Sequence, residues 1–493
     1  MRHYIKEIGK HSTIYSISNI LTKAIGIILI PIYTKFLSVE DYGIISIISP
    51  LIAALSIIYT FGLKTTLNRF YFDYEESSRQ QKILIGNVVI LLLIFCVFFN
   101  GLFLLFRNTF EKIFTGISFS PFIILALLTA STFIFYDIKL TLFRVREQSL
   151  KFGAYSIARF SGIVVLTIVA VVHYSMGALG KVLAEFIITI IFFIISCIAL
   201  YKEIILKIDI KLIKSLLKYA LPIVPHALAG AAVGLGGKLF LNYFDGLESI
   251  GIYNIGFLIG SIMNIIVVSI NLAWNPFFIK IVNKQKNEAK PIIAKLSTYY
   301  MLFISFIALG ISFFGKEAVL ILTTEEYYQA DSIIPIIVFN YFLSGLYYII
   351  ISKIFYIKKA VKYIPFVTLS TAFLYIFLNY YLIPHFGIYG TAWALFITTF
   401  IRLIITFIIS QKVFFIKYEY KKLIILLLIL IISIIFYLIC DTYIYSIFWG
   451  ILFKLGILFF FFILLHIFRF LNKSEIDNLK DIYNKLKVRY IKK

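Results

Sequence analysis

Long apolar stretches recur along the chain from residue 12 to residue 467, and only short polar segments separate them. Most are about 20 residues or longer, the length that an α-helix needs to cross a hydrocarbon core of roughly 30 Å. No segment between them is long enough for a soluble domain. The pattern predicts an all-α polytopic membrane protein. Its fourteen predicted spans are 12–36, 43–67, 83–106, 119–140, 153–173, 178–200, 219–243, 250–279, 291–314, 332–355, 363–383, 388–410, 422–440 and 446–467.

The charge distribution predicts how these spans are oriented. The 493 residues include 47 Lys and Arg against 24 Asp and Glu, a net charge of +23 that would indicate nucleic-acid binding in a soluble chain. The predicted outer segments, however, carry only Lys35, Arg107, Lys112 and Lys316. By the positive-inside rule both termini are therefore cytoplasmic. The basic excess is then explained by topology and by contact with anionic inner-leaflet lipid, which argues against a nucleic-acid role.

Two short motifs recur at nearly the same offset. Segment 39–44 (Val-Glu-Asp-Tyr-Gly-Ile) returns as 247–252 (Leu-Glu-Ser-Ile-Gly-Ile), and segment 177–180 (Gly-Ala-Leu-Gly) returns as 387–390 (Gly-Ile-Tyr-Gly). Six spans separate the copies, so the two halves insert with the same orientation and form parallel repeats. We therefore predict an N-terminal six-helix lobe at 1–210, a C-terminal six-helix lobe at 211–415, and two extra helices with a basic cytoplasmic tail at 416–493.

Parallel repeats of this kind place a binding site between the halves near the bilayer midplane. The first two spans of each predicted lobe carry polar residues at helical spacing. Such residues also pack helices together, but four matching stripes favour a shared hydrated cavity. The stripes comprise Ser12, Ser16, Asn19, Lys23 and Gly26; Ser46, Ser49, Ser56, Thr60 and Lys64; His226, Gly230, Gly234, Lys238 and Asn242; and Asn254, Ser261, Asn264, Asn271 and Asn275.

The charges within the spans indicate what enters that cavity. A Lys or Arg at the bilayer centre costs about 2.5 to 3.5 kcal/mol on insertion scales, so it should face water, a partner or a ligand. A cavity with several cations and few carboxylates suits an anionic head group. Near a span end a long side chain can instead reach the interface, an alternative that stays open for Lys64 and Arg159. The candidate binding residues are Lys23, Lys238, Lys64, Arg159, Asn19, Asn264, Asn271 and Asn275.

Two further residues are candidates for coupling or gating. Glu185 is the one carboxylate clearly within a predicted span, with Lys181 four residues before it, and His226 follows two prolines that predict a kink in span seven. The scattered histidines and three cysteines have no metal-ligand spacing, and the sequence contains no nucleotide-binding or hydrolytic motif. We therefore expect a transporter without a catalytic site, metal or cofactor.

The chain resembles the polysaccharide-unit (O-antigen, Wzx-type) flippases of the multidrug, oligosaccharidyl-lipid and polysaccharide exporter superfamily. The resemblance covers almost the whole chain and includes the 6 + 6 + 2 layout and segments 38–43, 68–71 (Asn-Arg-Phe-Tyr) and 143–146 (Phe-Arg-Val-Arg). It implies a bacterial cytoplasmic (inner) membrane protein that translocates an undecaprenyl-pyrophosphate-linked oligosaccharide from the inner to the outer leaflet. A polysaccharide polymerase and other assembly proteins are then the expected partners.

Three other functions stay open at this stage. A lipid II flippase has the same layout and the same cationic cavity. A cation-coupled multidrug exporter would be favoured by acidic residues deep in the first lobe, where the sequence offers little beyond Glu185. A membrane-embedded glycosyltransferase or polymerase needs a catalytic carboxylate or base beside a sizeable loop, and no such loop is predicted.

Overall fold

The computed structural model describes residues 26–75, 78–284, 288–441 and 447–470, and every regular element within these ranges is helical. Twelve helical segments in them are long and apolar enough to cross a membrane. One of these, α16 (Tyr363–Val413), bends at Gly387 and therefore holds two predicted spans. The first predicted span is described only over Gly26–Phe36. With these two adjustments the structure confirms the all-α fold with about fourteen spans.

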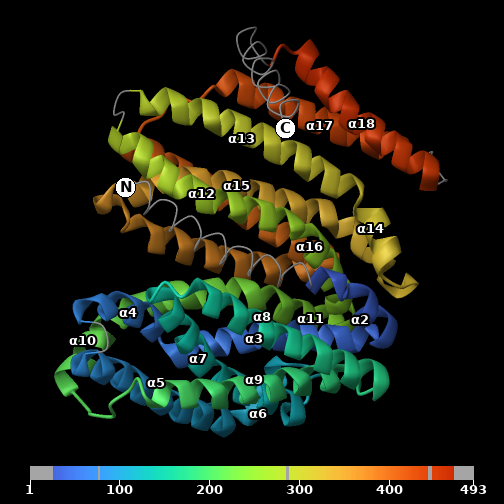
Figure 1. The fold of residues 1–493 in the computed structure, drawn as a ribbon. Coiled ribbons are helices and arrows are strands. Elements are labelled where there is room, and N and C mark those ends of the chain that lie inside the picture. Colours follow the sequence, from blue (N-terminus) through green and yellow to red (C-terminus); the bar gives the residue numbers. More distant parts are fainter. Residues whose placement is uncertain (1–25, 76–77, 285–287, 442–446, 471–493) are drawn as a thin grey trace, which may run out of the picture. The chain divides into compact units, whose positions relative to one another are not determined.

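Local sequence signals explain where the helices of the N-terminal half begin. Ser38 caps α3 by accepting a hydrogen bond from the Asp41 amide at 3.0 Å, and Ser78 caps α5 in the same way through the Gln81 amide. In Figure 1, α7 lies beside α3 and α9, which are its main packing partners. The helices of this half are α2 (Ile30–Phe36), α3 (Val39–Thr60), α4 (Leu63–Phe70), α5 (Arg79–Leu105), α6 (Arg107–Ile113), α7 (Ile124–Val145), α8 (Ser149–Ile168) and α9 (Gly177–Tyr201).

Glycines with positive φ divide the longest helices of the remaining sequence. At Gly246 the backbone adopts φ 87° and ψ 178°, which only glycine adopts readily, so α11 changes direction between predicted spans seven and eight. Gly387 does the same in α16. The other helices are α10 (Ile210–Ala220), α11 (Val224–Gly260), α12 (Ile262–Lys284), α13 (Ala289–Phe313), α14 (Gly315–Leu322), α15 (Ile334–Tyr356), α17 (Tyr420–Asp441) and α18 (Ile447–Ile467).

The helices group into two compact units. Unit 1 contains the described residues up to Ile259 together with Ala318–Ile337 and Lys362–Arg402. Unit 2 contains Gly260–Glu317, Val338–Val361 and the described residues from Leu403 onward. These boundaries differ from those of the predicted lobes, and the division into lobes at 210 and 415 stays a prediction.

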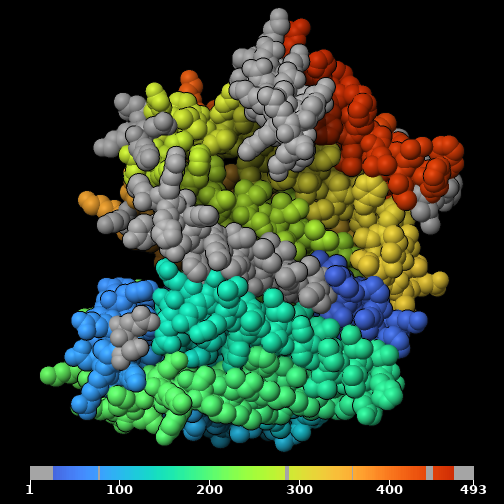
Figure 2. Space-filling model, in the orientation of Figure 1, coloured from blue at the N-terminus to red at the C-terminus, as the bar shows by residue number. Residues whose placement is uncertain are grey.

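In unit 2, α17 and α18 pack against each other and against α13. The surface of α18, part of which Figure 2 shows in red, carries large apolar side chains, with Phe448 70% and Phe459 68% exposed. Such a surface is expected of a helix that faces lipid, because lipid tails solvate apolar side chains as well as a protein core does.

Candidate functional site

The two copies of the repeat motif contact each other through matching glycines in unit 1. A Cβ atom added to Gly43 would lie 2.1 Å from the carbonyl oxygen of Leu247, and one added to Gly251 would lie 2.4 Å from that of Val39. Gly43 and Gly251 are equivalent positions of the repeat, as are Val39 and Leu247. The contact is therefore reciprocal, as a two-fold relation between the copies requires. The Gly43–Leu247 and Gly251–Val39 contacts both lie at the membrane side that the charge distribution predicts to be outside.

In the second repeat motif, the backbone conformation explains why both copies begin with glycine. Gly177 has φ 57° and Gly387 has φ 51°, so each begins its motif in a backbone conformation that other residues rarely adopt. A Cβ atom on Gly177 would lie 2.8 Å from a carboxylate oxygen of Asp41, and one on Gly387 would lie 2.8 Å from a carboxylate oxygen of Asp245. Each glycine thus lets the chain turn closely over an acidic side chain in unit 1.

Lys238 joins two equivalent positions of the repeat. Its side chain is buried in unit 1, where Nζ donates hydrogen bonds to the carbonyl oxygen of Ser46 at 3.0 Å and to Oδ1 of Asn254 at 2.7 Å. Ser46 on α3 and Asn254 on α11 occupy matching places in the two repeats. The ammonium also lies 5.9 Å from the centre of the Phe257 ring, within range of a cation–π interaction.

The charge of Lys238 has no carboxylate partner within the part of the chain that the structure describes, because both of its hydrogen-bond acceptors are neutral. A buried cation that lacks a counter-ion is costly, and its charge is available to an anionic ligand. Lys23 and Asn19, which the sequence analysis associates with Lys238, lie outside the described residues.

Arg159 lies in a polar network between α8 and α9. Its guanidinium donates to Oγ1 of Thr189 at 2.8 Å and lies 4.8 Å from the centre of the Phe133 ring. Glu185, one helical turn before Thr189, accepts a hydrogen bond from Lys181 and interacts electrostatically with Arg159. The predicted Lys181–Glu185 pair is confirmed. Two cations share one carboxylate in this network, which leaves a net positive charge.

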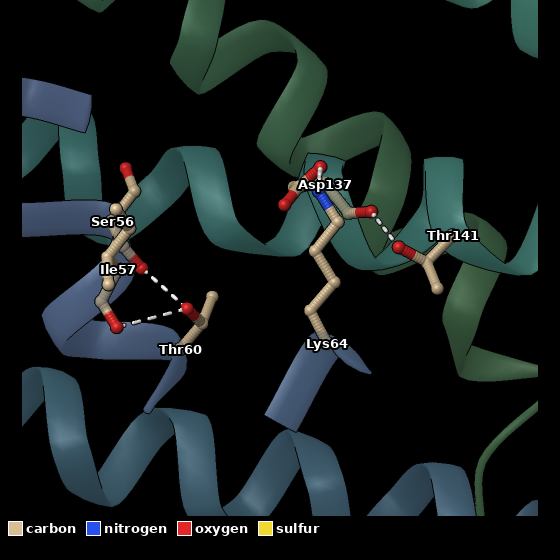
Figure 3. Close-up of polar contacts among 6 residues, drawn as sticks. All are labelled: Ser56, Ile57, Thr60, Lys64, Asp137 and Thr141. Atoms are coloured by element: carbon tan, nitrogen blue, oxygen red, sulfur yellow. Dashed lines mark hydrogen bonds and ion pairs between the residues drawn. The ribbon is translucent and has the colours of Figure 1, made fainter. Parts of the chain in front are cut away.

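Lys64 pairs with Asp137, with 2.7 Å between Nζ and Oδ1 (Figure 3). From its place near a span end, the side chain of Lys64 could also extend to the membrane interface. In the structure its ammonium instead contacts a carboxylate on α7. The side chain of Lys64 is 39% exposed, so solvent screens the pair and limits its contribution to about 0–1 kcal/mol. The charge of Lys64 is therefore offset by Asp137, which leaves it a weak candidate for binding an anion.

Three hydroxyls of the polar stripe on α3 donate hydrogen bonds within their own helix, whereas the Ser49 hydroxyl accepts one from Lys181 on α9 at 3.0 Å. Ser46, Ser56 and Thr60 each donate to a carbonyl four residues earlier, at 2.6, 2.7 and 2.8 Å. Figure 3 shows the Thr60 hydroxyl directed at the backbone of Ser56 and Ile57. Hydroxyls that are satisfied in this way do not need water, so these three residues give no separate support to the predicted hydrated cavity.

Three candidate asparagines of predicted span eight lie on α12 in unit 2. Asn275 donates to Oδ1 of Asn271 at 3.4 Å and accepts from the Ser352 hydroxyl at 2.6 Å, which links α12 to α15. Asn264 is half-buried on the same helix. Asn271 and Asn275 thus lie together, and each has a lone pair or an N–H group left for a ligand.

The predicted kink of span seven takes the form of a short 3₁₀ turn. Residues Leu221–Ile223 form this turn between α10 and α11, and Pro225 follows in the first turn of α11, where its missing N–H breaks no helical bond. His226 is exposed there. Further along α11, a Cβ atom on Gly237 would lie 2.0 Å from the Tyr375 hydroxyl oxygen, so the glycine-rich segment 234–237 permits close helix packing at that residue.

A polar cavity of about 550 Å³ lies beside Gly246 in unit 1, at the end predicted to face outward. Asn242 lines it and donates to the backbone and side-chain oxygens of Thr115 at 2.7 and 3.0 Å. The other polar lining residues include the carboxylates Glu40, Asp245 and Glu248. Its charge is therefore opposite to that of Lys238.

On the side predicted to face the cytoplasm, Glu203 contacts two basic residues: Lys139 of α7 and Arg146, which directly follows that helix. Its carboxylate lies 2.8 Å from Lys139 Nζ and 3.1 Å from a guanidinium nitrogen of Arg146. Arg146 also donates to the Tyr71 hydroxyl at 2.7 Å. Lys139 is only two residues from Asp137 in the sequence, but Asp137 pairs with Lys64 and Lys139 pairs with Glu203. Burial alone would raise the pKa of Glu203, yet its bonds to Lys139 and Arg146 hold that pKa below its usual value.

We expect Glu203→Gln to destabilise the protein at neutral pH by about 1.5–3 kcal/mol, because it removes charge-assisted hydrogen bonds. A carboxyl whose pKa is lowered by folding stabilises the fold above its unfolded pKa of about 4.3, and this stabilisation is lost as the pH falls through the lower folded value. The stability difference between wild type and Glu203→Gln should therefore shrink below about pH 4. Thermal unfolding in detergent across pH 3–7 measures this stability difference. Glu326→Gln, at an exposed position, is the control. A difference that stays constant with pH would contradict the assignment.

Three comparisons place this geometry among known proteins. Residues 8–282 match the model of a family described as "Polysaccharide biosynthesis protein". No protein of curated function matches the sequence. Solved structures match over most of the chain, at sequence identities that show similarity of fold alone.

The fold is similar to that of a lipid II flippase, MurJ, in an inward closed conformation, with a TM-score of 0.74 and 15% identity over 92% of this chain and 98% of that one. It is also similar to an inward-facing multidrug resistance MATE family transporter of the MOP superfamily, with a TM-score of 0.60 and 14% identity over 78% and 92% of the chains. A MOP superfamily transporter from Pyrococcus furiosus, described as having a binding pocket of reverse polarity, matches with a TM-score of 0.55 and 13% identity over 82% and 95%.

Proposed function

Because the chain belongs to the family of polysaccharide biosynthesis proteins, we propose that it is a flippase which moves an undecaprenyl-pyrophosphate-linked oligosaccharide unit from the inner to the outer leaflet. The observation that carries this proposal is Lys238, a buried ammonium held between equivalent positions of two repeats with only neutral partners among the described residues. A lipid-linked pyrophosphate supplies the negative charge that this position lacks.

The head group would be recognised by charge and hydrogen bonds. Lys238 and Lys23 offset the phosphate charge, while the net positive Arg159 network on α8 and α9 attracts it without forming a fixed pair. Asn19 is proposed to contribute an amide to the same head group. In unit 2, Asn264, Asn271 and Asn275 are proposed by themselves to offer amides, which bond equally well to phosphate oxygens and sugar hydroxyls. Lys64 contributes least, since Asp137 already neutralises it.

The direction of movement follows from how the repeats meet. The reciprocal glycine contacts join the two copies at the end predicted to face outward, so transport requires that these contacts separate. Alternating access in parallel repeats occurs when one half rocks against the other. The carboxylates of the polar cavity at that end repel an anionic head group and thus favour its release.

The energy source is proposed to act through titratable groups of α9 and α11. Protonation of Glu185 would leave Lys181 and Arg159 without a counter-charge and thereby change the affinity of this region for an anion. His226, exposed at the start of α11 just after the 3₁₀ turn, is the proposed gate residue. The polyprenyl tail would stay in lipid, with α17 and α18 as its proposed groove.

Related cargoes are distinguished by their chemistry. Lipid II carries the same polyprenyl pyrophosphate, so its transport differs from the proposed function only in the glycan. An organic cation, as carried by a cation-coupled multidrug exporter, would be repelled by Lys238 and by the Arg159 network.

Transport by the full-length protein in proteoliposomes tests the proposal. We expect it to move a fluorescent undecaprenyl-pyrophosphate-linked oligosaccharide between leaflets, as measured by protection from an impermeant quencher. Uncharged polyprenyl-linked glycan tests the need for phosphate, lipid II tests the glycan, and an organic cation tests the drug-export alternative. Equal transport of charged and uncharged lipids, or transport of the cation alone, would refute the proposal.

A further inference from the structure

Unit 2 contains a second, apolar cavity that none of the residues above lines. It has a volume of about 260 Å³ and lies among α13, α15, α16 and α17. Its walls are almost entirely hydrocarbon, so it suits part of a single lipid chain and is slightly smaller than the pockets that hold drug-sized molecules. The lining residues include Met301, Leu346, Ile350, Leu403, Phe407 and Leu423.

One end of this cavity is polar. Tyr418, which is 7% exposed, lines it, and its buried hydroxyl has no hydrogen-bond partner among the described residues. A buried hydroxyl that lacks a partner costs about 1–3 kcal/mol, so its retention at a cavity wall indicates a missing ligand. Burial raises the pKa of Tyr418, so the phenol keeps its proton at neutral pH and acts as a donor.

A lysine lies directly behind this tyrosine. Lys353 on α15 is 1% exposed, and its Nζ lies 5.1 Å from the centre of the Tyr418 ring. Within the described part of the chain its sole hydrogen-bond acceptor is Oε1 of Gln411, at 3.3 Å. The ammonium has three N–H donors, so two stay unused, and no carboxylate offsets its charge there.

Gln411 fixes the geometry of this polar end. Its Nε2 donates to the carbonyl oxygen of Ile416 at 2.9 Å, and its Oε1 accepts from the Ile416 amide at 3.0 Å. These two bonds hold the turn that carries Tyr418. In the predicted topology this turn lies at the cytoplasmic interface, while the apolar walls extend from it toward the midplane. A lipid of the inner leaflet has the same arrangement, with its polar head at the cytoplasmic interface and its chain directed toward the midplane.

From this arrangement we propose that unit 2 binds a lipid with a phosphate head and a single inserted chain, the phosphate at Tyr418 and Lys353 and the chain in the apolar cavity. The proposal does not depend on Lys238 or on the transported cargo. Two lipids share the required chemistry: an anionic phospholipid of the membrane and a polyprenyl phosphate.

Photo-crosslinking in nanodiscs tests this site. We expect a phosphatidylglycerol with a photoreactive acyl chain to label peptides from segments 346–350 and 403–407 of the full-length protein. Loss of a bond to a charged head group should lower this labelling about tenfold in Tyr418→Phe and in Lys353→Met. The exposed Tyr363→Phe is the matched control, and monodisperse elution of every variant shows that it is folded.

Competition then identifies the occupant. Unlabelled phosphatidylglycerol that displaces the probe better than polyprenyl phosphate indicates a membrane phospholipid, and the reverse indicates the carrier lipid. Both results support a site for a phosphate-bearing chain. Equal competition by uncharged diacylglycerol, or unchanged labelling in both variants, would overturn it. Neither outcome bears on transport, so failure of this site and failure of the proposed flippase function are separate results.

Discussion

Replacing Lys238 with Met should lower transport of the pyrophosphate-linked substrate about 10- to 100-fold while leaving the protein at least as stable as the wild type. The first effect follows from losing a charge-assisted contact worth about 1.5–3 kcal/mol, at roughly tenfold for each 1.4 kcal/mol. The second follows because an apolar side chain of similar volume removes the cost of a buried cation that lacks a counter-ion. Flipping rates in proteoliposomes and thermal unfolding measure the two effects.

The opposite signs of these effects separate a binding role from a structural one. If Lys238 only joins α3 to α11 through Ser46 and Asn254, the variant should lose stability and activity together. Lys238→Arg keeps the charge and should keep more transport than Lys238→Met. The exposed Lys218→Met on α10 controls for loss of one positive charge. A normal transport rate in Lys238→Met would exclude the ammonium from substrate handling.

The fold could be predicted from the sequence because its dominant signal is local. Each span is recognisable from its own apolar residues, and the repeat is recognisable from Gly43 with Gly251 and from Gly177 with Gly387. The structure gives the physical reason for these matches: two glycines permit close backbone contact and two permit a tight turn. The merging of two spans into α16 could not be foreseen, since it depends on helical geometry continuing around Gly387.

The partners of the charged residues could be predicted only where they lie on the same helix. Glu185 and Lys181 are four residues apart, so their spacing on one helix predicts the pair that the structure contains. Lys139 instead pairs with Glu203, which lies in a loop 64 residues away. The Lys353–Tyr418 site was missed for the same reason. A periodic pattern reports which residues share a helix face, but it does not report which helices are neighbours.

The second large effect is expected from adding one methyl group at the repeat contact. In Gly43→Ala the new Cβ would meet a backbone oxygen at 2.1 Å, so α3 and the segment around Leu247 must separate. Overpacking of this kind costs about 1–3 kcal/mol. That cost falls on the state in which the outward end is closed, so the equilibrium should move away from closure by about 5- to 150-fold.

Labelling from outside the cell measures this shift. With the native cysteines replaced, Ser249→Cys beside the contact should react faster with an impermeant maleimide when Gly43→Ala is present. Gly251→Ala should have the same effect, because the contact is reciprocal and its Cβ would meet the Val39 oxygen at 2.4 Å. Gly234→Ala is the matched control: apart from the adjoining turns of α11, no atom of the described residues lies within 4 Å of its Cβ position. It should therefore leave labelling unchanged and stabilise α11 by about 0.5–1 kcal/mol. If only one of the two contact glycines responds, the two copies do not share the closure equally, and if neither responds, the contact is not what closes this end.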